Sequence, residues 1–241
     1  MTTLVFFHGW GASGRIWEPQ AAAFGHRMPV LTPTVPVWEE GWFSEYLRGL
    51  NLQECLLVGW SLGGMLLLEA LSRLTDPPKG LVLAGVAPVF TRRPDYPWGQ
   101  PPGVVRAMRR ALMKNMKNMN TKNPAQVLAE FAEQCLAPGE AAFASQAREA
   151  FAVPAAAGTL AAGLDYLLHG DLRPLLPRLP SGAVVIQGQA DRIVDPAQGR
   201  FLQEHLSGAR LNLLPAAGHL PFLTQAAAFN GILETCLSTA S

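Results

Sequence analysis

Residues 55–65, CLLVGWSLGGM, place a serine between glycines where an apolar run gives way to helix-forming residues. Residues 55–58 have the length and composition of a buried strand, and residues 66–71 are good helix formers. Between them, residues 59–63 fit the pattern G-x-S-x-G. A chain that passes from strand to helix over so few residues must bend sharply, and the flanking glycines remove the Cβ clashes of such a bend. The pattern predicts a nucleophile elbow with Ser61 exposed at its apex.

The same pattern also has a purely structural interpretation. A serine beside a glycine is common in turns and at helix N-caps, and G-x-S-x-G arises by chance in many chains. A serine hydroxyl is a poor nucleophile unless a base, usually a histidine, lies beside it and a carboxylate orients that base. The choice between the two interpretations therefore depends on whether the rest of the chain supplies these partners.

The length and composition predict one globular domain with an insertion. The chain has 241 residues, of which 49% are hydrophobic and 15% charged, so it can bury a core and is not typical of disorder. No basic region precedes its first apolar run, and it has no stretch of about 20 uninterrupted apolar residues. We therefore expect a cytoplasmic monomer that is not embedded in a membrane.

Neither a metal nor another cofactor is expected from the sequence. The three cysteines, Cys55, Cys135 and Cys236, are odd in number and far apart, which is typical of neither a disulfide framework nor a metal site. The net charge of +1 argues against nucleic acid as a partner.

Short apolar runs alternate with helical stretches in two parts of the chain, which predicts right-handed crossovers and a mostly parallel sheet. Six strands are expected, at about residues 3–9, 29–33, 54–60, 80–86, 183–188 and 209–215. The alternation stops after the fourth strand, where the chain reads as several helices. The sequence therefore predicts an α/β fold whose core comprises residues 1–87 and 172–241, with residues 88–171 inserted as a helical cap.

The chain has five histidines that could supply the base. His219, in PAAGHLPF, follows the last expected strand, so it should lie at the carboxyl end of the sheet, as Ser61 does. The other four are expected in surface helices, in the insertion or in the first turn: His26, His205, His169 and His8. We therefore predict that His219 is the base.

Two aspartates compete for the role of the acid. Asp191 follows the expected strand at residues 183–188 by three positions, at the carboxyl end of the sheet. Asp195 precedes Pro196 and has the features of an N-cap for the next helix. We favour Asp191, and the resulting order of Ser61, Asp191 and His219 is that of an α/β-hydrolase.

Backbone N–H groups are needed to bind the oxyanion that forms during acyl transfer. Leu62 would begin the helix after the elbow, where N–H groups are free. The second donor is expected in the turn HGWG at residues 8–11, with Trp10 as the candidate and its indole as a wall of the site. The turn could also be a tight turn with no further role.

Four stretches resemble signature segments of the α/β-hydrolase family over essentially the whole chain: FFHGWGASGRIW, VGWSLGG, GQADRIVDP and AAGHLPF. Within this family, the chain is most similar to the pimeloyl-acyl-carrier-protein methyl ester esterases of biotin synthesis. The shared features are the Trp of HGWG, the Trp before Ser61, and LDYLLHGDLRPLL at residues 164–176.

The resemblance implies a set of roles and a substrate. Ser61 corresponds to the nucleophile, Asp191 to the acid and His219 to the base, and the oxyanion donors correspond to Trp10 and Leu62. The implied reaction cleaves the methyl ester of a pimeloyl chain that is carried on acyl-carrier protein. The alternatives are a general short-chain carboxylesterase, a carbon–carbon bond hydrolase, a menaquinone-pathway lyase and a non-catalytic binding protein.

Two expectations concern the insertion. Its large apolar side chains could line an acyl tunnel, namely Phe90, Met108 and Phe143, although ordinary packing between the cap helices and the sheet is the better interpretation for any single one of them. Residues 90–123 carry a charge of +7, whereas the rest of the chain carries −6. Helical spacing puts four of the eight basic residues of this segment on one face, namely Arg106, Arg110, Lys114 and Lys117. We predict that an acidic carrier protein docks on these four residues and on Arg109. A solvated helix face is the alternative.

Overall fold

The computed structural model describes residues 1–114, 124–152 and 156–239. Its six strands form one sheet in the order β2-β1-β3-β4-β5-β6, and every neighbouring pair is parallel. The strands are β1 (Thr3–Phe7), β2 (Val30–Leu31), β3 (Cys55–Trp60), β4 (Gly80–Ala84), β5 (Val184–Gly188) and β6 (Arg210–Leu214). The prediction of a mostly parallel sheet of about six strands is confirmed.

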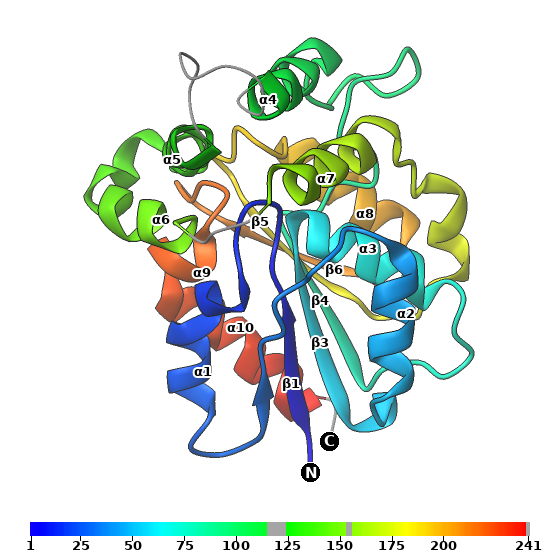
Figure 1. The fold of residues 1–241 in the computed structure, drawn as a ribbon. Coiled ribbons are helices and arrows are strands. Elements are labelled where there is room, and N and C mark those ends of the chain that lie inside the picture. The colour runs from blue at the N-terminus through cyan, green and yellow to red at the C-terminus, as the bar shows by residue number, and fades with distance from the viewer. Residues whose placement is uncertain (115–123, 153–155, 240–241) are drawn as a thin grey trace.

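Helices cover both faces of this sheet (Figure 1). On one face lie α1 (Glu18–Phe24) and α10 (Ala226–Thr239), and on the other α2 (Glu40–Arg48), α3 (Ser61–Leu71) and α8 (Pro196–His205). All six residues of β3 are buried, as expected for a strand covered on both faces. Shorter helical turns are η1 (Gly14–Trp17), η2 (Leu52–Glu54), η4 (Arg173–Arg178) and α9 (Pro221–Thr224).

Aromatic side chains fill the space between the sheet and its helices. On the α1 side, the Trp17 ring lies 4.9 Å from the ring of Phe6 on β1 and 4.3 Å from that of Phe222 on α9. On the α2 side, the ring centroids of Phe7 and Phe43 are 5.3 Å apart. These contacts fix the helices against β1, and with them the loop that follows this strand.

The chain between β4 and β5 forms helices, and its described residues contain no strand. These elements are α4 (Pro102–Lys114), α5 (Pro124–Gln134), η3 (Pro138–Phe143), α6 (Ala144–Ala150) and α7 (Ala157–His169). Figure 1 shows α4, α5 and α7 above the carboxyl ends of the strands. They therefore lie over the end of the sheet where the predicted site residues were expected.

Strand β2 is shorter than the sequence indicates. Residues 29–33 were expected to pair, but only Val30 and Leu31 do. Both Pro29 and Pro33 lack an N–H group, and a proline cannot donate to a neighbouring strand. The strand is consequently a short one at the edge of the sheet.

Candidate active site

Ser61 lies at the sharp bend between β3 and α3. Its φ angle is 52°, in the left-handed region that non-glycine residues rarely adopt. The bend brings α3 so close to β1 that a Cβ on Gly63 would lie 2.1 Å from the carbonyl oxygen of His8. The backbone geometry that the glycine pattern predicts is therefore present. The prediction that Ser61 is exposed is wrong: the residue is only 8% exposed, because residues of α4, α5 and α7 surround it.

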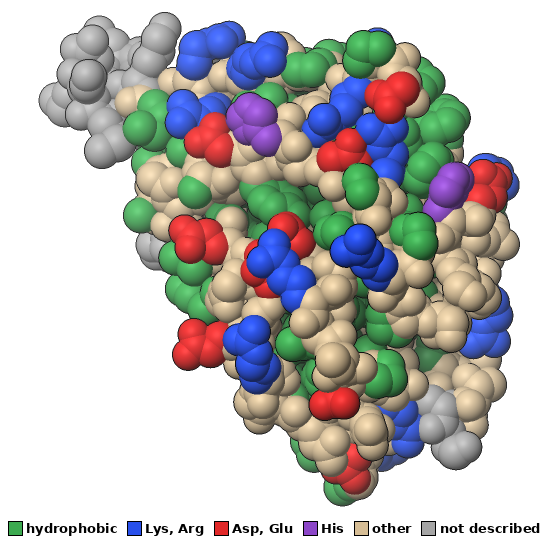
Figure 2. All heavy atoms as spheres, turned by 90° about the vertical axis from the view of Figure 1, so that its right-hand side faces the viewer, with side chains coloured by type: hydrophobic (Ala, Val, Ile, Leu, Met, Phe, Trp, Pro, Cys, Tyr) green, Lys and Arg blue, Asp and Glu red, His purple; other side chains and the backbone are tan. Residues whose placement is uncertain are grey.

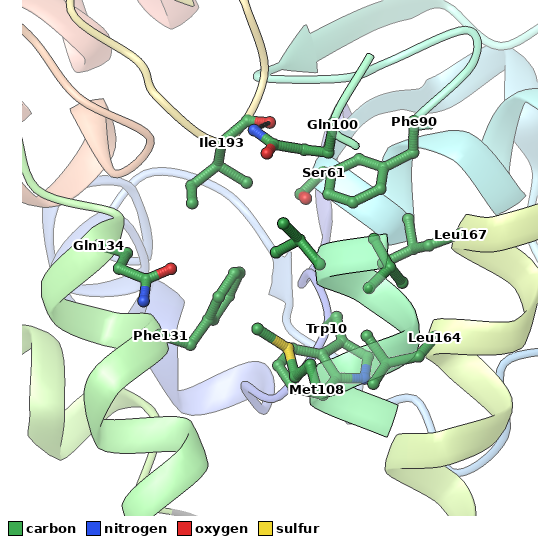
Figure 3. Close-up of a pocket in the computed structure, with 12 residues that line it drawn as sticks. Trp10, Ser61, Phe90, Gln100, Met108, Phe131, Gln134, Leu164, Leu167 and Ile193 are labelled. Carbon is green, nitrogen blue, oxygen red and sulfur yellow. Dashed lines mark hydrogen bonds between the residues drawn. The ribbon is translucent and has the colours of Figure 1, made fainter. Parts of the chain in front are cut away.

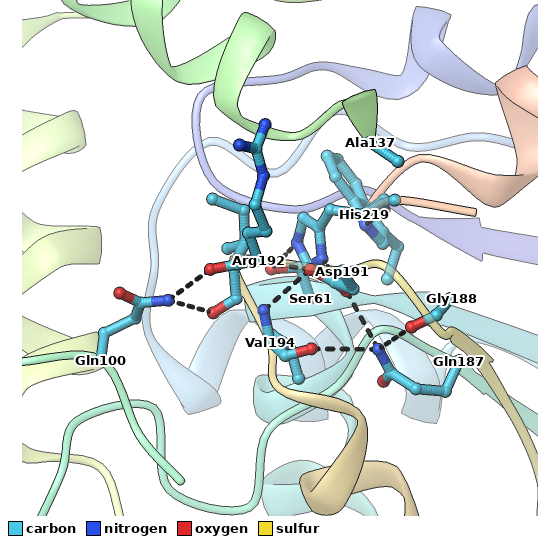
Figure 4. A network of polar contacts seen from close by, with 12 residues as sticks. Ser61, Gln100, Ala137, Gln187, Gly188, Asp191, Arg192, Val194 and His219 are labelled. Carbon is cyan, nitrogen blue, oxygen red and sulfur yellow. Dashed lines mark hydrogen bonds and ion pairs between the residues drawn. The ribbon is translucent and has the colours of Figure 1, made fainter. Parts of the chain in front are cut away.

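The structure brings Ser61, His219 and Asp191 together (Figure 4). His219 Nε2 lies 3.0 Å from Ser61 Oγ, and His219 Nδ1 lies 2.7 Å from Asp191 Oδ2. Ser61 follows β3, Asp191 follows β5 and His219 follows β6, so three strand ends supply the three side chains. Because both His219 and Asp191 are buried, their contact is shielded from bulk water.

Further hydrogen bonds fix the Asp191 carboxylate. Its Oδ1 accepts from the N–H groups of Ile193 (2.8 Å) and Val194 (2.9 Å), and its Oδ2 accepts from Gln187 Nε2 (3.1 Å). Asp195 instead caps α8, because its Oδ1 accepts from the N–H of Ala197 at the start of that helix. The carboxylate at the histidine is thus the one that the strand spacing favoured.

The two predicted oxyanion donors lie beside Ser61. Leu62 is the second residue of α3, and Trp10 belongs to the loop after β1. Within the described residues, neither N–H donates to a protein acceptor. The Trp10 indole donates to the carbonyl of Leu160 on α7 (2.8 Å), so this loop is also attached to the helices above it.

His8 has a structural role in the same loop, as its position after the first strand indicates. Its Nδ1–H donates to the Gly9 carbonyl (2.9 Å), and its Nε2 accepts from the Val35 N–H (2.8 Å). Burial lowers the pKa of His8 from 6.5 to about 4. The ring is therefore neutral at neutral pH, and it joins the Trp10 loop to the segment after β2.

A cavity opens at Ser61 beneath α4, α5 and α7 (Figure 3). Its volume is about 40 Å³, and none of its described lining side chains is charged. It is lined by Trp10, Ser61, Phe90, Gln100, Val104, Val105, Met108, Phe131, Gln134, Leu164, Leu167 and Ile193. The site therefore offers a narrow, mainly apolar space beside the serine hydroxyl.

Three of the predicted lining residues, Trp10, Phe90 and Met108, line this cavity, but Phe143 does not. Phe143 ends η3, which packs against α6 and α9. Phe131 of α5 takes a lining position that the sequence analysis missed. Its spacing from Val127 and Leu128 marks a buried helix face, and this signal alone does not separate a lining residue from a core residue.

The predicted docking residues differ in what they contact. Arg106 and Arg110 are exposed on α4, whereas Arg109 Nη2 donates to Asp165 Oδ2 on α7 (2.9 Å). Lys114 is the last residue of α4, and Lys117 lies outside the described residues. Figure 2 shows Lys and Arg side chains gathered along the upper rim of the molecule, at the end where Figure 1 places α4 and α7.

Two kinds of feature are absent from the part of the chain that the structure describes. No helix there is both long and apolar enough to cross a membrane. No cluster of three or more His, Cys, Asp or Glu side chains there could hold a metal ion.

Comparison with known proteins identifies the family. Residues 4–232 match the Alpha/beta hydrolase family, and the chain belongs to it. It is 29% identical to the pimeloyl-[acyl-carrier protein] methyl ester esterase of Aromatoleum aromaticum, over 92% of each chain. The enzyme of the same name from Chromobacterium violaceum is also 29% identical, over 98% of this chain and 94% of that one.

Solved structures share the fold. An esterase from Exiguobacterium antarcticum superposes with a TM-score of 0.83 at 23% identity, covering 100% of this chain and 92% of that one. An enol-lactonase from Burkholderia xenovorans gives a TM-score of 0.78 at 22% identity, covering 98% of this chain and 91% of the other. The predicted fold class is confirmed as the α/β-hydrolase fold.

Proposed function

We propose that this chain is a serine carboxylesterase in which Ser61 is the nucleophile, His219 the base and Asp191 the orienting acid. The observation that carries this proposal is the continuous series of hydrogen bonds from Ser61 Oγ through the imidazole to Asp191. A histidine bonded in this way can take the hydroxyl proton as the oxygen attacks. The buried carboxylate holds the ring in the tautomer that leaves Nε2 free to accept.

The reaction then has two halves. Ser61 Oγ attacks the ester carbonyl, and the N–H groups of Trp10 and Leu62 bind the resulting oxyanion. His219 passes its proton to the leaving alcohol, and an acyl-enzyme forms. A water molecule, deprotonated by His219, attacks the acyl-enzyme and releases the carboxylic acid, after which Ser61 regains its proton. No step requires a metal or cofactor.

The proposed substrate is the methyl ester of a pimeloyl chain on acyl-carrier protein. The names of the relatives support this choice, and so does the cavity, whose uncharged lining suits the neutral ester of an aliphatic chain. In this proposal residues 88–171 form a cap that covers the acyl chain. The narrowness of the cavity favours the alternative, a general short-chain carboxylesterase.

Hydrolysis assays separate the two activities. The purified chain is given pimeloyl-acyl-carrier-protein methyl ester and, separately, p-nitrophenyl butyrate, and kcat/KM is measured for each. The proposal requires a clearly higher value for the carrier-bound ester and rescue of biotin-free growth in a strain lacking its own esterase. Turnover of p-nitrophenyl butyrate alone would identify a general esterase. Failure with every ester, together with no labelling of Ser61 by a fluorophosphonate, would refute both.

The carrier is proposed to dock on Arg106 and Arg110, with Lys114 and Lys117 extending the same basic segment. Arg109 has a lesser part in this proposal, because Asp165 already binds its guanidinium. Reversing both exposed charges, Arg106→Glu with Arg110→Glu, should raise KM for the carrier-bound ester roughly tenfold at low salt. The control pair, Arg48→Glu with Arg178→Glu, changes the net charge equally on exposed residues outside 88–171. Equal effects of the two pairs, or an equal loss on p-nitrophenyl butyrate, would contradict docking at α4.

A further inference from the structure

The turn between α5 and η3 contacts two of the loops that carry site residues. The N–H of His219 donates to the carbonyl of Cys135 (2.7 Å), and Arg192 Nη2 donates to the carbonyl of Leu136 (2.8 Å). Arg192 directly follows Asp191 in the chain. The loops after β5 and β6 are therefore both attached to one short segment of the inserted helices.

Glu140 makes a third attachment. Its Oε2 accepts from the N–H of Gly218 (3.0 Å), the residue before His219, and from the N–H of Ala137 (2.8 Å). The loop and the turn are in tight contact, since a Cβ on Gly218 would lie 2.5 Å from the Cys135 carbonyl oxygen. The side chain of Glu140 therefore bridges its own turn and the backbone beside His219.

Helix capping does not account for this arrangement. A Glu at the third position of a helix often accepts from the backbone N–H at the cap, as Glu140 does from Ala137. Such a residue normally lies at the surface, whereas Glu140 is only 6% exposed. Its Oε1 is buried and has no hydrogen-bond partner among the described residues. The buried placement and the bond to Gly218 serve the neighbouring loop and add nothing to the cap.

We propose that Glu140 is a positioning residue for His219, an inference that rests on the proposed serine esterase function. Asp191 fixes the imidazole at Nδ1, while Glu140 and Cys135 fix the backbone from which the ring extends. Nε2 must stay within hydrogen-bond reach of Ser61 Oγ, and the two atoms are 3.0 Å apart. Releasing the Gly218 N–H lets this backbone shift, and a displacement of about 1 Å at a reacting group can cost on the order of 100-fold in rate.

Three variants of Glu140 test the proposal. They differ in the length of the side chain and in its ability to accept hydrogen bonds. Glu140→Asp keeps the carboxylate but is one methylene shorter, so it cannot reach both N–H groups. Glu140→Ala removes the acceptor. Both should lower kcat on p-nitrophenyl butyrate about 10- to 100-fold with little change in KM, and slow fluorophosphonate labelling of Ser61 in parallel. Glu140→Gln keeps an oxygen that can accept from both N–H groups, so it should stay within about threefold of the wild type.

The control is Tyr166→Phe. It removes a different hydrogen bond between the inserted helices and the core, in which Tyr166 Oη donates to Glu69 Oε2 (2.6 Å). Neither residue belongs to the loops that carry Asp191 and His219. This variant should lower the melting temperature without lowering kcat. The proposal is overturned if Glu140→Asp is folded and as active as the wild type, or if Glu140→Gln loses as much kcat as Glu140→Asp. An inactive wild type would refute the esterase function itself and would be recognised before any variant is compared.

Discussion

The loops at the carboxyl ends of the strands and the helices between β4 and β5 border the same cavity but are held in different ways. In the loops, hydrogen bonds with defined directions fix each side chain, as the four contacts of Asp191 show. The helices border the cavity with apolar side chains such as Met108, Phe131 and Leu164, although hydrogen bonds attach them to the core elsewhere. The difference teaches that the proposed reacting groups are fixed by directional bonds, whereas the proposed space for the substrate is set by apolar packing.

The largest effect should come from the loops, at Ser61. Ser61→Ala removes the proposed nucleophile, and kcat/KM should fall by on the order of 10⁴- to 10⁶-fold. The melting temperature should change little, because alanine adopts the left-handed backbone no more easily than serine. Ester hydrolysis and thermal unfolding of the purified variant measure both. A variant that keeps a near-normal rate would show that the loops do not carry the chemistry.

The two aspartates in the loop after β5 should differ strongly in their effect on kcat, although they lie only four residues apart. Asp191→Asn should lower kcat by about 10⁴-fold, because the amide favours the wrong tautomer of His219. Asp195→Asn should leave kcat almost unchanged, since asparagine also caps helices well. Steady-state kinetics of both variants provide the measurement. A reversed order of the two losses would assign the acid to Asp195.

The pH dependence of the free energy of unfolding tests whether His8 is held buried and neutral in its loop. Its pKa is about 4 in the folded protein and about 6.5 when exposed, so the unfolded chain binds more protons between these values. The stabilising contribution is therefore complete above pH 6.5 and declines as the pH falls towards 4, by up to about 3 kcal/mol. Urea unfolding at pH 7 and at pH 5 should show a lower free energy of unfolding at pH 5.

The control for this experiment removes the titrating group. His8→Gln should flatten the pH dependence of unfolding, because the amide can make both hydrogen bonds without titrating in this range. An equally steep pH dependence in His8→Gln would assign the effect to other groups.

The smallest effect should come from the helices. Phe131→Leu enlarges a cavity of about 40 Å³ and should raise the ratio of kcat/KM for p-nitrophenyl octanoate over the acetate several-fold. The matched variant Phe143→Leu should leave this ratio unchanged, because Phe143 does not line the cavity. If both variants shift the ratio alike, the packing of the helices as a whole controls chain length.

The sequence predicted which side chains meet at the carboxyl ends of the strands, for a physical reason. Strands are visible as apolar runs, and the end of each parallel strand places the next few residues at one edge of the sheet. Ser61, Asp191 and His219 could each be found from their distance to such a run. Choosing Asp191 over Asp195 required only the additional recognition of a helix cap.

The contacts of the inserted helices could not be found in this way. Helical periodicity identifies a buried face but does not show which neighbour it contacts, which is why Phe143 was wrongly assigned to the cavity and Phe131 was missed. The bond between Arg109 and Asp165 joins residues far apart in the chain, and no local pattern indicates it. The same holds for Glu140, whose partner Gly218 lies in another element.

The left-handed backbone of Ser61 has an evolutionary consequence. A serine with a φ angle of 52° lowers the stability of the fold by about 1–3 kcal/mol relative to a relaxed residue. Glycine adopts this conformation without strain, so selection for stability alone would replace the serine. In a descendant released from catalysis, Ser61 should therefore be among the first of the site residues to be lost, well before Asp191, whose carboxylate also fixes the backbone of its own loop.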